Sequence, residues 1–131
     1  MKYDFDCVVV GAGIAGMTAA IYLKRANLNV LILDNDTPGG LLNKISVIEN
    51  YPGFTSISGP DLAYKLYEQV KALDVEIRYG RVLNIDDHIV TTDIEKITAN
   101  KVILAVGRKA RKIDNTNDLK NVSYCALCDA S

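Results

Sequence analysis

The chain has 131 residues, 49% of them hydrophobic, which is enough to form the packed core of one ordinary domain. Fifteen lysines and arginines against sixteen acidic residues give a net charge of −1, and this balance argues against a nucleic-acid-binding surface. The sequence starts without the basic and apolar segments of a signal peptide, and no apolar run reaches membrane-spanning length, so we expect a soluble, cytoplasmic protein.

A glycine-rich loop near the start of the chain follows a predicted strand and precedes a predicted helix. Residues 5–10 (FDCVVV) form a short apolar, β-branched run, and residues 14–26 carry apolar side chains at helical spacing. Gly11, Gly13 and Gly16 form the pattern G-x-G-x-x-G at this junction. Backbone N–H groups at the start of the helix can bind a pyrophosphate, and the helix dipole favours an anion at the same place.

A second buried strand follows this helix. Residues 29–33 (NVLIL) are apolar at successive positions, as expected for a parallel strand that is covered on both faces, and the run stops at Asp34. An acidic residue at this place could accept hydrogen bonds from the ribose of an adenosine. The β-α-β context therefore favours a dinucleotide site over a glycine-rich structural turn, but it does not distinguish FAD from a nicotinamide cofactor.

The middle of the chain is predicted to be a long loop followed by a second helix. Residues 35–60 are rich in Gly, Pro, Asn and Ser, with one short helical turn expected at residues 41–44. Long loops in compact domains are often functional. The second helix begins at Pro60 and Asp61 and carries one apolar stripe, which consists of Leu62, Leu66, Val70 and Leu73.

Further segments alternate or run apolar between turn residues and are predicted to be strands at hairpin spacing. These segments are residues 75–80, 81–86, 88–93 and 96–107. Basic and polar residues follow Gly107 and indicate an exit from the domain. The order of elements predicts an α/β, Rossmann-like domain, in which a parallel sheet carries helices on both faces and is joined by a small antiparallel β-meander.

Two of the three cysteines, Cys125 and Cys128, form a C-x-x-C pair close to the last residue. In a reducing compartment such a pair indicates thiol exchange or metal binding, because a nearby positive field can convert one thiol to a reactive thiolate. A structural zinc site needs four ligands, and the remaining candidates are Cys7 in an apolar strand and His88 in a polar turn. We therefore favour thiol exchange over a metal site or a coincidental pair, and we predict no metal.

Six motifs together resemble the low-molecular-weight thioredoxin reductases, the FAD and dithiol enzymes of the pyridine nucleotide-disulfide oxidoreductase group. The motifs are GAGIAG (11–16), TPGGLL (37–42), ENYPGF (49–54), SGPDL (58–62), AVGRKAR (105–111) and YCALCD (124–129). Each motif is weak alone, but their order and spacing are specific and they cover nearly the whole chain.

The resemblance implies that the first glycine loop binds FAD. It places Gly11, Gly13, Ile14 and Ala15 along the pyrophosphate, and Asp34 and Asn35 near the adenosine. Further cofactor positions follow from the other motifs: Gly40, Leu41 and Leu42 at the flavin, Asn50 in the E-N-x-P-G motif, Val82 beside the adenine, and Ala105, Val106 and Gly107 at a strand end that passes the cofactor.

The resemblance also implies an activity and its partners. The enzymes of this group pass electrons from NADPH through FAD and a dithiol to thioredoxin or a thioredoxin-like protein, and the family suggests a homodimer. Carried over to this chain, Cys128 faces the flavin, Cys125 attacks the disulfide of the substrate and Asp129 handles the proton.

Two residues depart from the family pattern. Leu41 replaces a glutamine that could hydrogen-bond the flavin, and Ala130 replaces a glycine after the C-x-x-C-D motif. These departures leave open whether NADPH or ferredoxin is the electron donor, because some relatives of this group use ferredoxin.

The family pattern divides the chain into two parts. Residues 1–112 correspond to the N-terminal part of an FAD-binding domain, and residues 113–131 to a linker and the start of a dithiol and NADPH domain whose remainder is absent. We therefore expect a truncated portion of a longer enzyme. An FAD-binding fragment without turnover is the alternative.

Overall fold

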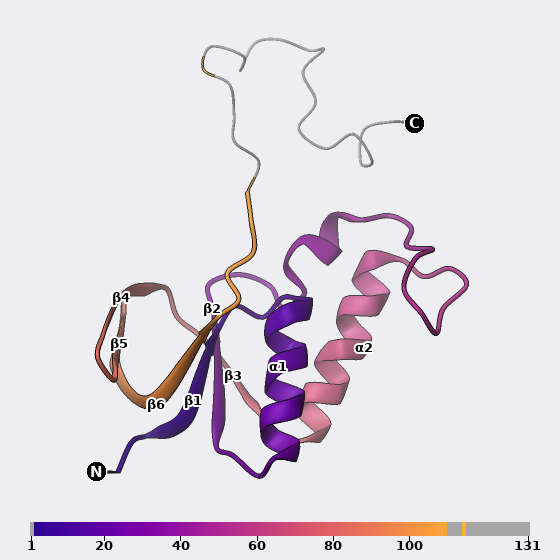
Figure 1. Ribbon diagram of the computed structural model, residues 1–131. Helices are drawn as coiled ribbons and strands as arrows, with labels where there is room; N and C mark the ends of the chain where they lie inside the picture. Colours follow the sequence, from indigo (N-terminus) through magenta and orange to yellow (C-terminus); the bar gives the residue numbers. More distant parts are fainter. Residues whose placement is uncertain (1, 110–113, 115–131) are drawn as a thin grey trace.

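The computed structural model describes residues 2–109 and 114, which form a six-stranded sheet flanked by helices (Figure 1). The elements in chain order are β1 (Phe5–Val10), α1 (Ile14–Arg25), β2 (Val30–Asp34), the 3-10 helix η1 (Gly40–Lys44), α2 (Gly59–Ala72), β3 (Glu76–Tyr79), β4 (Val82–Asp86), β5 (Ile89–Thr92) and β6 (Lys96–Leu104). The predicted strands, both predicted helices and the short helical turn are confirmed. No helix within residues 2–109 is long and apolar enough to cross a membrane.

The sheet combines a parallel and an antiparallel half. Its strand order is β3-β2-β1-β6-β5-β4, with β1 parallel to both β2 and β6, and β2 parallel to β3. Strands β4, β5 and β6 pair antiparallel. Strand β6 belongs to both halves, because Ile97 and Thr98 pair with β5 whereas the residues from Ala99 to Leu104 lie along β1. The predicted meander is therefore continuous with the parallel sheet.

Alternate residues of the central strands belong to two separate apolar clusters, as the two-residue period of a strand requires. The first cluster joins β1 and β2 to the helices and includes Val9, Ile32, Met17, Leu62 and Leu66. The second cluster joins the same strands to the meander and includes Val8, Leu31, Leu33, Val90 and Ile97. Strands β1 and β2 are thus buried on both faces, which explains their unbroken apolar sequences.

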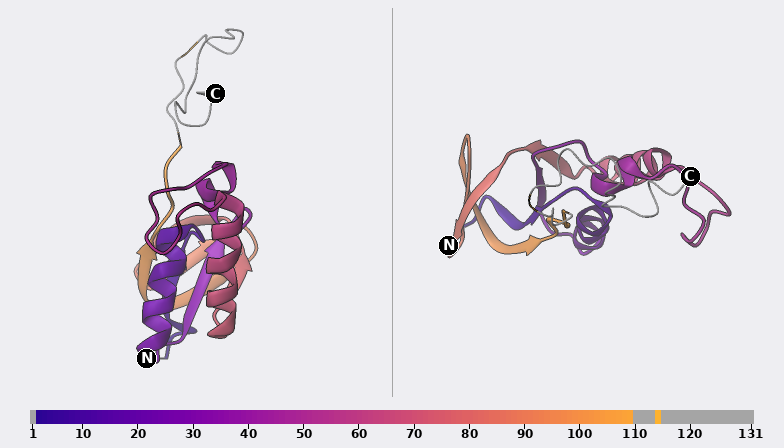
Figure 2. Two further views of the ribbon diagram at one scale, coloured as in Figure 1. Left: turned by 90° about the vertical axis from the view of Figure 1, so that its right-hand side faces the viewer. Right: turned by 90° about the horizontal axis from the view of Figure 1, so that it is seen from above.

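Both α1 and α2 lie on one face of the sheet (Figures 1 and 2), so the predicted helices on both faces are not found among the described residues. The chain passes from β1 through α1 to β2, and then through α2 to β3, adding each parallel strand on the same side of the last. Since such crossovers are right-handed, two successive steps in one direction place both helices on one face. The opposite face of β1 and β2 packs instead against the antiparallel part of the sheet, through the second apolar cluster.

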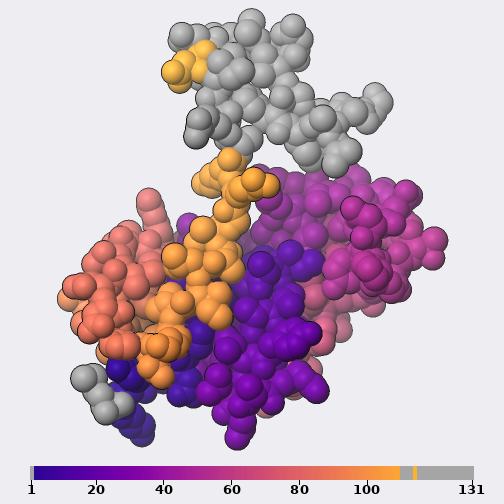
Figure 3. Space-filling model, in the orientation of Figure 1, coloured from indigo at the N-terminus to yellow at the C-terminus, as the bar shows by residue number. Residues whose placement is uncertain are grey.

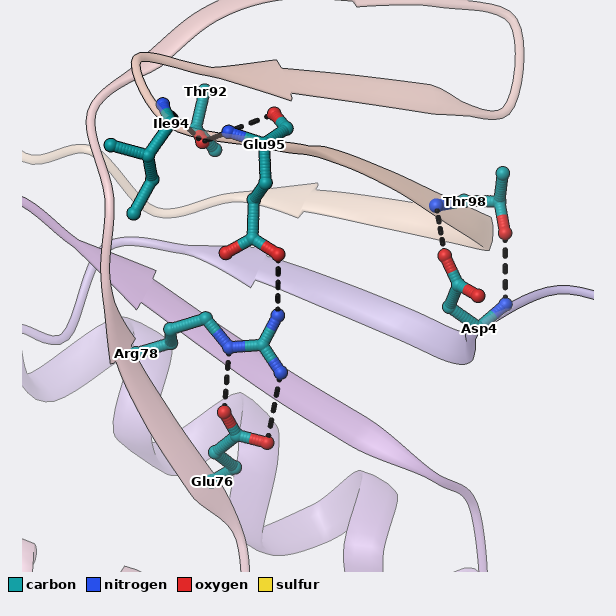
Figure 4. Close-up of polar contacts among 7 residues, drawn as sticks. All are labelled: Asp4, Glu76, Arg78, Thr92, Ile94, Glu95 and Thr98. Atoms are coloured by element: carbon teal, nitrogen blue, oxygen red, sulfur yellow. Dashed lines mark hydrogen bonds and ion pairs between the residues drawn. The ribbon is translucent and has the colours of Figure 1, made fainter.

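A side-chain network ties β3 to the turn between β5 and β6 (Figure 4). Arg78 donates from Nε and Nη2 to the two carboxylate oxygens of Glu76, at 2.6 and 3.1 Å, and from Nη1 to Glu95 at 3.0 Å. The hydrogen bonds from Arg78 hold the pKa of Glu76 below its usual range. Near the start of β1, Asp4 accepts a hydrogen bond from the backbone N–H of Thr98 at 2.9 Å and so joins β1 to β6.

The SGPDL motif forms the start of α2. Ser58 caps the helix, and its hydroxyl accepts a hydrogen bond from the backbone N–H of Asp61 at 3.1 Å. A Cβ at Gly59 would clash with the carbonyl oxygen of Leu42, and the Gly59 N–H donates to the carbonyl of Ile45 at 2.9 Å. The glycine is therefore required because η1 packs directly against the first turn of α2.

Candidate functional site

Most predicted cofactor residues lie at one edge of the sheet. β1 ends at Val10, β2 at Asp34 and β6 at Leu104, and these three strands are parallel, so their carboxyl ends meet. In Figure 3 the orange segment that follows β6 lies against the indigo segment that contains the glycine loop. Open α/β sheets bind ligands outside this edge.

The three glycines of the loop differ in what surrounds them. Gly11 has a φ of +111°, and a Cβ there would clash with the carbonyl oxygen of Ala105. A Cβ at Gly16 would clash with the carbonyl oxygen of Gly11. At Gly13, by contrast, a Cβ would meet no other described part of the chain within 4 Å. Gly11 and Gly16 are therefore needed for internal packing, whereas Gly13 leaves space for a ligand.

This space lies at the N-terminus of α1. Gly13 is the N-cap residue and provides no side chain to cap the helix, and the first turn contains no acidic residue. The Gly13 carbonyl accepts a hydrogen bond from Met17 at 3.0 Å, so the N–H groups of Ile14 and Ala15 precede the first intrahelical bond. These N–H groups and the helix dipole suit an anionic group, and the missing Cβ of Gly13 provides the room that a pyrophosphate needs.

The peptide groups on either side of Ala12 are hydrogen-bonded to two other segments. The Ala12 N–H donates to Oδ2 of Asp34 at 2.7 Å, and the Ala12 carbonyl accepts from the N–H of Gly39 at 2.7 Å. Ala12 is fully buried. Sequence reasoning missed both Ala12 and Gly39, because these contacts involve backbone groups, and the first glycine of TPGG was the one available signal.

Asp34 has a structural role in addition to the predicted binding of ribose. Its Oδ1 accepts from the N–H of Asp36 at 3.0 Å, and its backbone carbonyl accepts from the N–H of Gly80 at 2.9 Å. The carboxylate thus bonds the glycine loop with one oxygen and the turn after β2 with the other. Each oxygen keeps a further lone pair that could accept a ribose hydroxyl.

The predicted flavin-contacting segment lies beside the glycine loop. A Cβ at Gly40 would lie 3.6 Å from the Cα of Gly13, so η1 begins next to the open space. Leu41 and Leu42 follow in η1, with Leu41 57% exposed and Leu42 half-buried. The strand end that contains Ala105 also reaches the loop, because the Ala105 N–H donates to the Val10 carbonyl at 2.8 Å.

The remaining predicted cofactor residues lie in several segments, and among them the backbone nitrogen of Val106 would be 3.4 Å from a Cβ at Gly11. Asn35 is exposed beyond the end of β2, and Val106 and Gly107 are exposed beyond β6. Asn50 is exposed in the loop that the bridge between Ile48 and Ile57 closes, and Val82 begins β4 and packs on the second apolar cluster. The predicted catalytic residues lie outside the described part of the chain; they are Cys125, Cys128 and Asp129.

The remaining cysteine, Cys7, has no features of a reactive thiol. It lies in β1 with 2% of its surface exposed, and burial, together with the charge of Asp6, raises the pKa of its thiol. Within residues 2–109 and 114, no group of three or more His, Cys, Asp or Glu side chains is arranged to hold a metal ion.

Comparison with known proteins gives a consistent result. The sequence profile of the pyridine nucleotide-disulphide oxidoreductase family matches residues 5–131. The thioredoxin reductase of Mycoplasma genitalium is 40% identical over 137 residues, covering 97% of this chain and 43% of that protein. The chain therefore spans less than half the length of the curated relatives that it matches.

Solved structures share the fold. Lactococcus lactis thioredoxin reductase superposes with a TM-score of 0.81 at 37% identity, over 98% of this chain and 45% of that one. A ferredoxin-flavin thioredoxin reductase from Clostridium acetobutylicum has a TM-score of 0.76 at 30% identity, over 96% of this chain and 46% of that one.

Gly16 and Gly13 should respond differently to the same substitution. We expect Gly16→Ala to lower the free energy of unfolding by about 2 kcal/mol or more, because the new methyl group meets the Gly11 carbonyl oxygen. Gly13→Ala should cost less than about 1 kcal/mol, because its methyl group enters open space. Urea denaturation of both variants measures the difference, and equal losses would contradict this account of the loop.

The two hydrogen bonds of Asp34 can be tested with an isosteric pair. Asp34→Asn leaves one acceptor oxygen for two N–H donors and should cost about 1–3 kcal/mol of unfolding free energy. Asp36→Asn is the matched control, since Asp36 accepts with Oδ1 alone, from Thr37 at 2.7 Å. Thermal unfolding followed by circular dichroism reports both, and a larger loss in Asp36→Asn would contradict the assignment.

Proposed function

The chain belongs to the pyridine nucleotide-disulphide oxidoreductase family, and on this premise we propose that it is the FAD-binding unit of a thioredoxin reductase. This enzyme would act as a homodimer and reduce the disulfide of thioredoxin or a thioredoxin-like protein. The observation that carries the proposal is the open N-terminus of α1 at Gly13, at the carboxyl edge of a parallel sheet.

The residues at the start of α1 suit the anionic pyrophosphate of FAD. Gly11, Gly13, Ile14 and Ala15 would hold the pyrophosphate, and the absence of an acidic residue from the first turn of α1 removes the charge that would oppose it. Asp34 and Asn35 would bind the adenosine ribose. The rest of the cofactor would lie along Gly40, Leu41, Leu42, Asn50, Val82, Ala105, Val106 and Gly107.

The proposed chemistry needs a cofactor and a dithiol. When bound, FAD would supply two-electron transfer between the donor and the protein thiols. Cys125, as a thiolate, attacks the disulfide of the protein substrate and forms a mixed disulfide. Cys128 then attacks the sulfur of Cys125, releases the reduced substrate and closes the Cys125–Cys128 disulfide, while Asp129 handles the proton. The proposal for these three residues rests on the C-x-x-C-D pattern and on the family resemblance.

NADPH is the proposed electron donor, and ferredoxin is the alternative. Two observations support ferredoxin as the alternative donor. Leu41 is an exposed apolar side chain at the position where the thioredoxin reductases have a glutamine. The fold also matches that of a ferredoxin-flavin thioredoxin reductase. Reduction of thioredoxin by the holoprotein, measured with NADPH and with reduced ferredoxin in parallel, distinguishes the two donors.

FAD binding is the first expected outcome. The purified chain titrated with FAD should quench flavin fluorescence, and Gly13→Ala should raise the dissociation constant at least about tenfold, because its methyl group occupies the space for the pyrophosphate. Ser56→Ala, in an exposed loop, is the control and should bind as the wild type does. Absence of FAD binding by the wild type would defeat the cofactor proposal.

The second expected outcome is a disulfide between the two cysteines of the C-x-x-C pair. After mild oxidation, alkylation and mass spectrometry should find Cys125 and Cys128 joined in a disulfide and Cys7 as the remaining thiol. Cys7 should alkylate only after unfolding, because it is buried and the pKa of its thiol is raised. Cys128→Ser should leave Cys125 free and abolish reduction of thioredoxin. A disulfide that includes Cys7 would count against the proposal.

A further inference from the structure

We propose that Gly39 is a positioning residue that fixes the shape of the FAD-binding loop through the backbone of Ala12. The inference rests on the proposed function, because it concerns the same loop, but it assigns a role to a residue that would not touch the cofactor. Gly39 is buried, and it is Gly40, the next residue, that approaches the open space at Gly13.

The hydrogen bond from Gly39 restrains the centre of the glycine loop. Ala12 lies there between Gly11 and Gly13, and glycine is the residue type with the greatest backbone freedom. With its N–H bound to Asp34 and its carbonyl bound to Gly39, Ala12 is held from two sides at 2.7 Å each. The directions of the following N–H groups, at Gly13 and Ile14, depend on that constraint.

Gly39 is itself held in place by α2 and by Asn43. Its φ is +113°, and a Cβ would lie 2.5 Å from Cβ of Ala63 in α2 and 2.9 Å from Nδ2 of Asn43. The same Nδ2 donates to the carbonyl of Pro38 at 3.1 Å, which closes the turn around Gly39. The position of the Gly39 N–H is therefore set by α2 and by the side chain of Asn43.

The other end of η1 is anchored as well. The carbonyl of Ile45 accepts from the N–H of Gly59 at 2.9 Å, at the start of α2. Because η1 is hydrogen-bonded to the glycine loop next to Gly39 and to α2 at Ile45, a displacement of η1 should be transmitted to the loop. A substitution of Asn43, which is exposed, should therefore weaken the hydrogen bond that the Ala12 carbonyl accepts from Gly39.

The test compares Asn43→Ala with Lys44→Ala, an exposed residue of the same short helix. In the cofactor-free chain, amide hydrogen exchange measured by NMR should quicken about fivefold at Gly39 and Ala12 in Asn43→Ala, the change expected from weakening one neutral hydrogen bond. The amide of Leu31, in the centre of the sheet, should exchange at the wild-type rate in both variants. The dissociation constant for FAD should rise by a similar factor in Asn43→Ala only.

Gly39→Ala should produce the same pattern with larger changes, and Asn43→Ala keeps the test valid if Gly39→Ala fails to fold. Unchanged exchange at Ala12 in Asn43→Ala, with Gly39 exchange quickened, would overturn the proposed coupling. Equal acceleration at Leu31 would also overturn it, because the effect would then be general destabilisation. If the variants show the coupling in hydrogen exchange but the wild-type chain binds no FAD, the proposed function is defeated and the structural role of Gly39 stands.

Discussion

The pair of hydrogen bonds on Ala12 is the constraint on which the arrangement of the site depends. A glycine loop has many accessible conformations, and folding must offset the entropy of selecting one of them. Here the carboxylate at the end of β2 binds the N–H of Ala12 and the turn before η1 binds its carbonyl. Three segments that are distant in sequence thus determine the conformation of one loop, and the open N-terminus of α1 follows directly after it.

Local patterns were sufficient to predict the elements. The apolar run of β1 and the serine, glycine and proline at the start of α2 are strong signals, and the structure places both elements within a few residues of the predictions. Within residues 2–109 the second face is covered by the antiparallel strands and not by helices, which the sequence could not indicate, because an apolar run shows that a strand is buried on both sides and does not show what covers each side. Handedness of the crossovers, together with the number of steps in one direction, decides that question.

The parts of the site that depend on residue type could be predicted from the sequence. The spacing of Gly11, Gly13 and Asp34 identified the loop and its acidic partner, and the structure brings them together. The G-x-G-x-x-G pattern itself assigns Gly11 to the tight turn, Gly13 to the approach of a phosphate and Gly16 to close packing of helix on strand. The surroundings of the three glycines are consistent with these roles, since a Cβ would clash at Gly11 and Gly16 and would meet open space at Gly13. Ala12 acts through its backbone groups, which leave almost no trace in the identity of the residue. Gly39 also acts through its backbone, and its φ of +113° explains only why the position is a glycine.

The position of β6 has a consequence for how the chain folds. Asp4 and Thr98 are hydrogen-bonded across a separation of 94 residues, and β1, the first strand, lies between β2 and the last strand β6. Closing so long a loop costs entropy before any contact compensates for it, and non-local strand pairing slows folding. On a ribosome, the centre of this sheet would remain incomplete until residues 99–104 had emerged, and β1 would have only β2 to pair with until then.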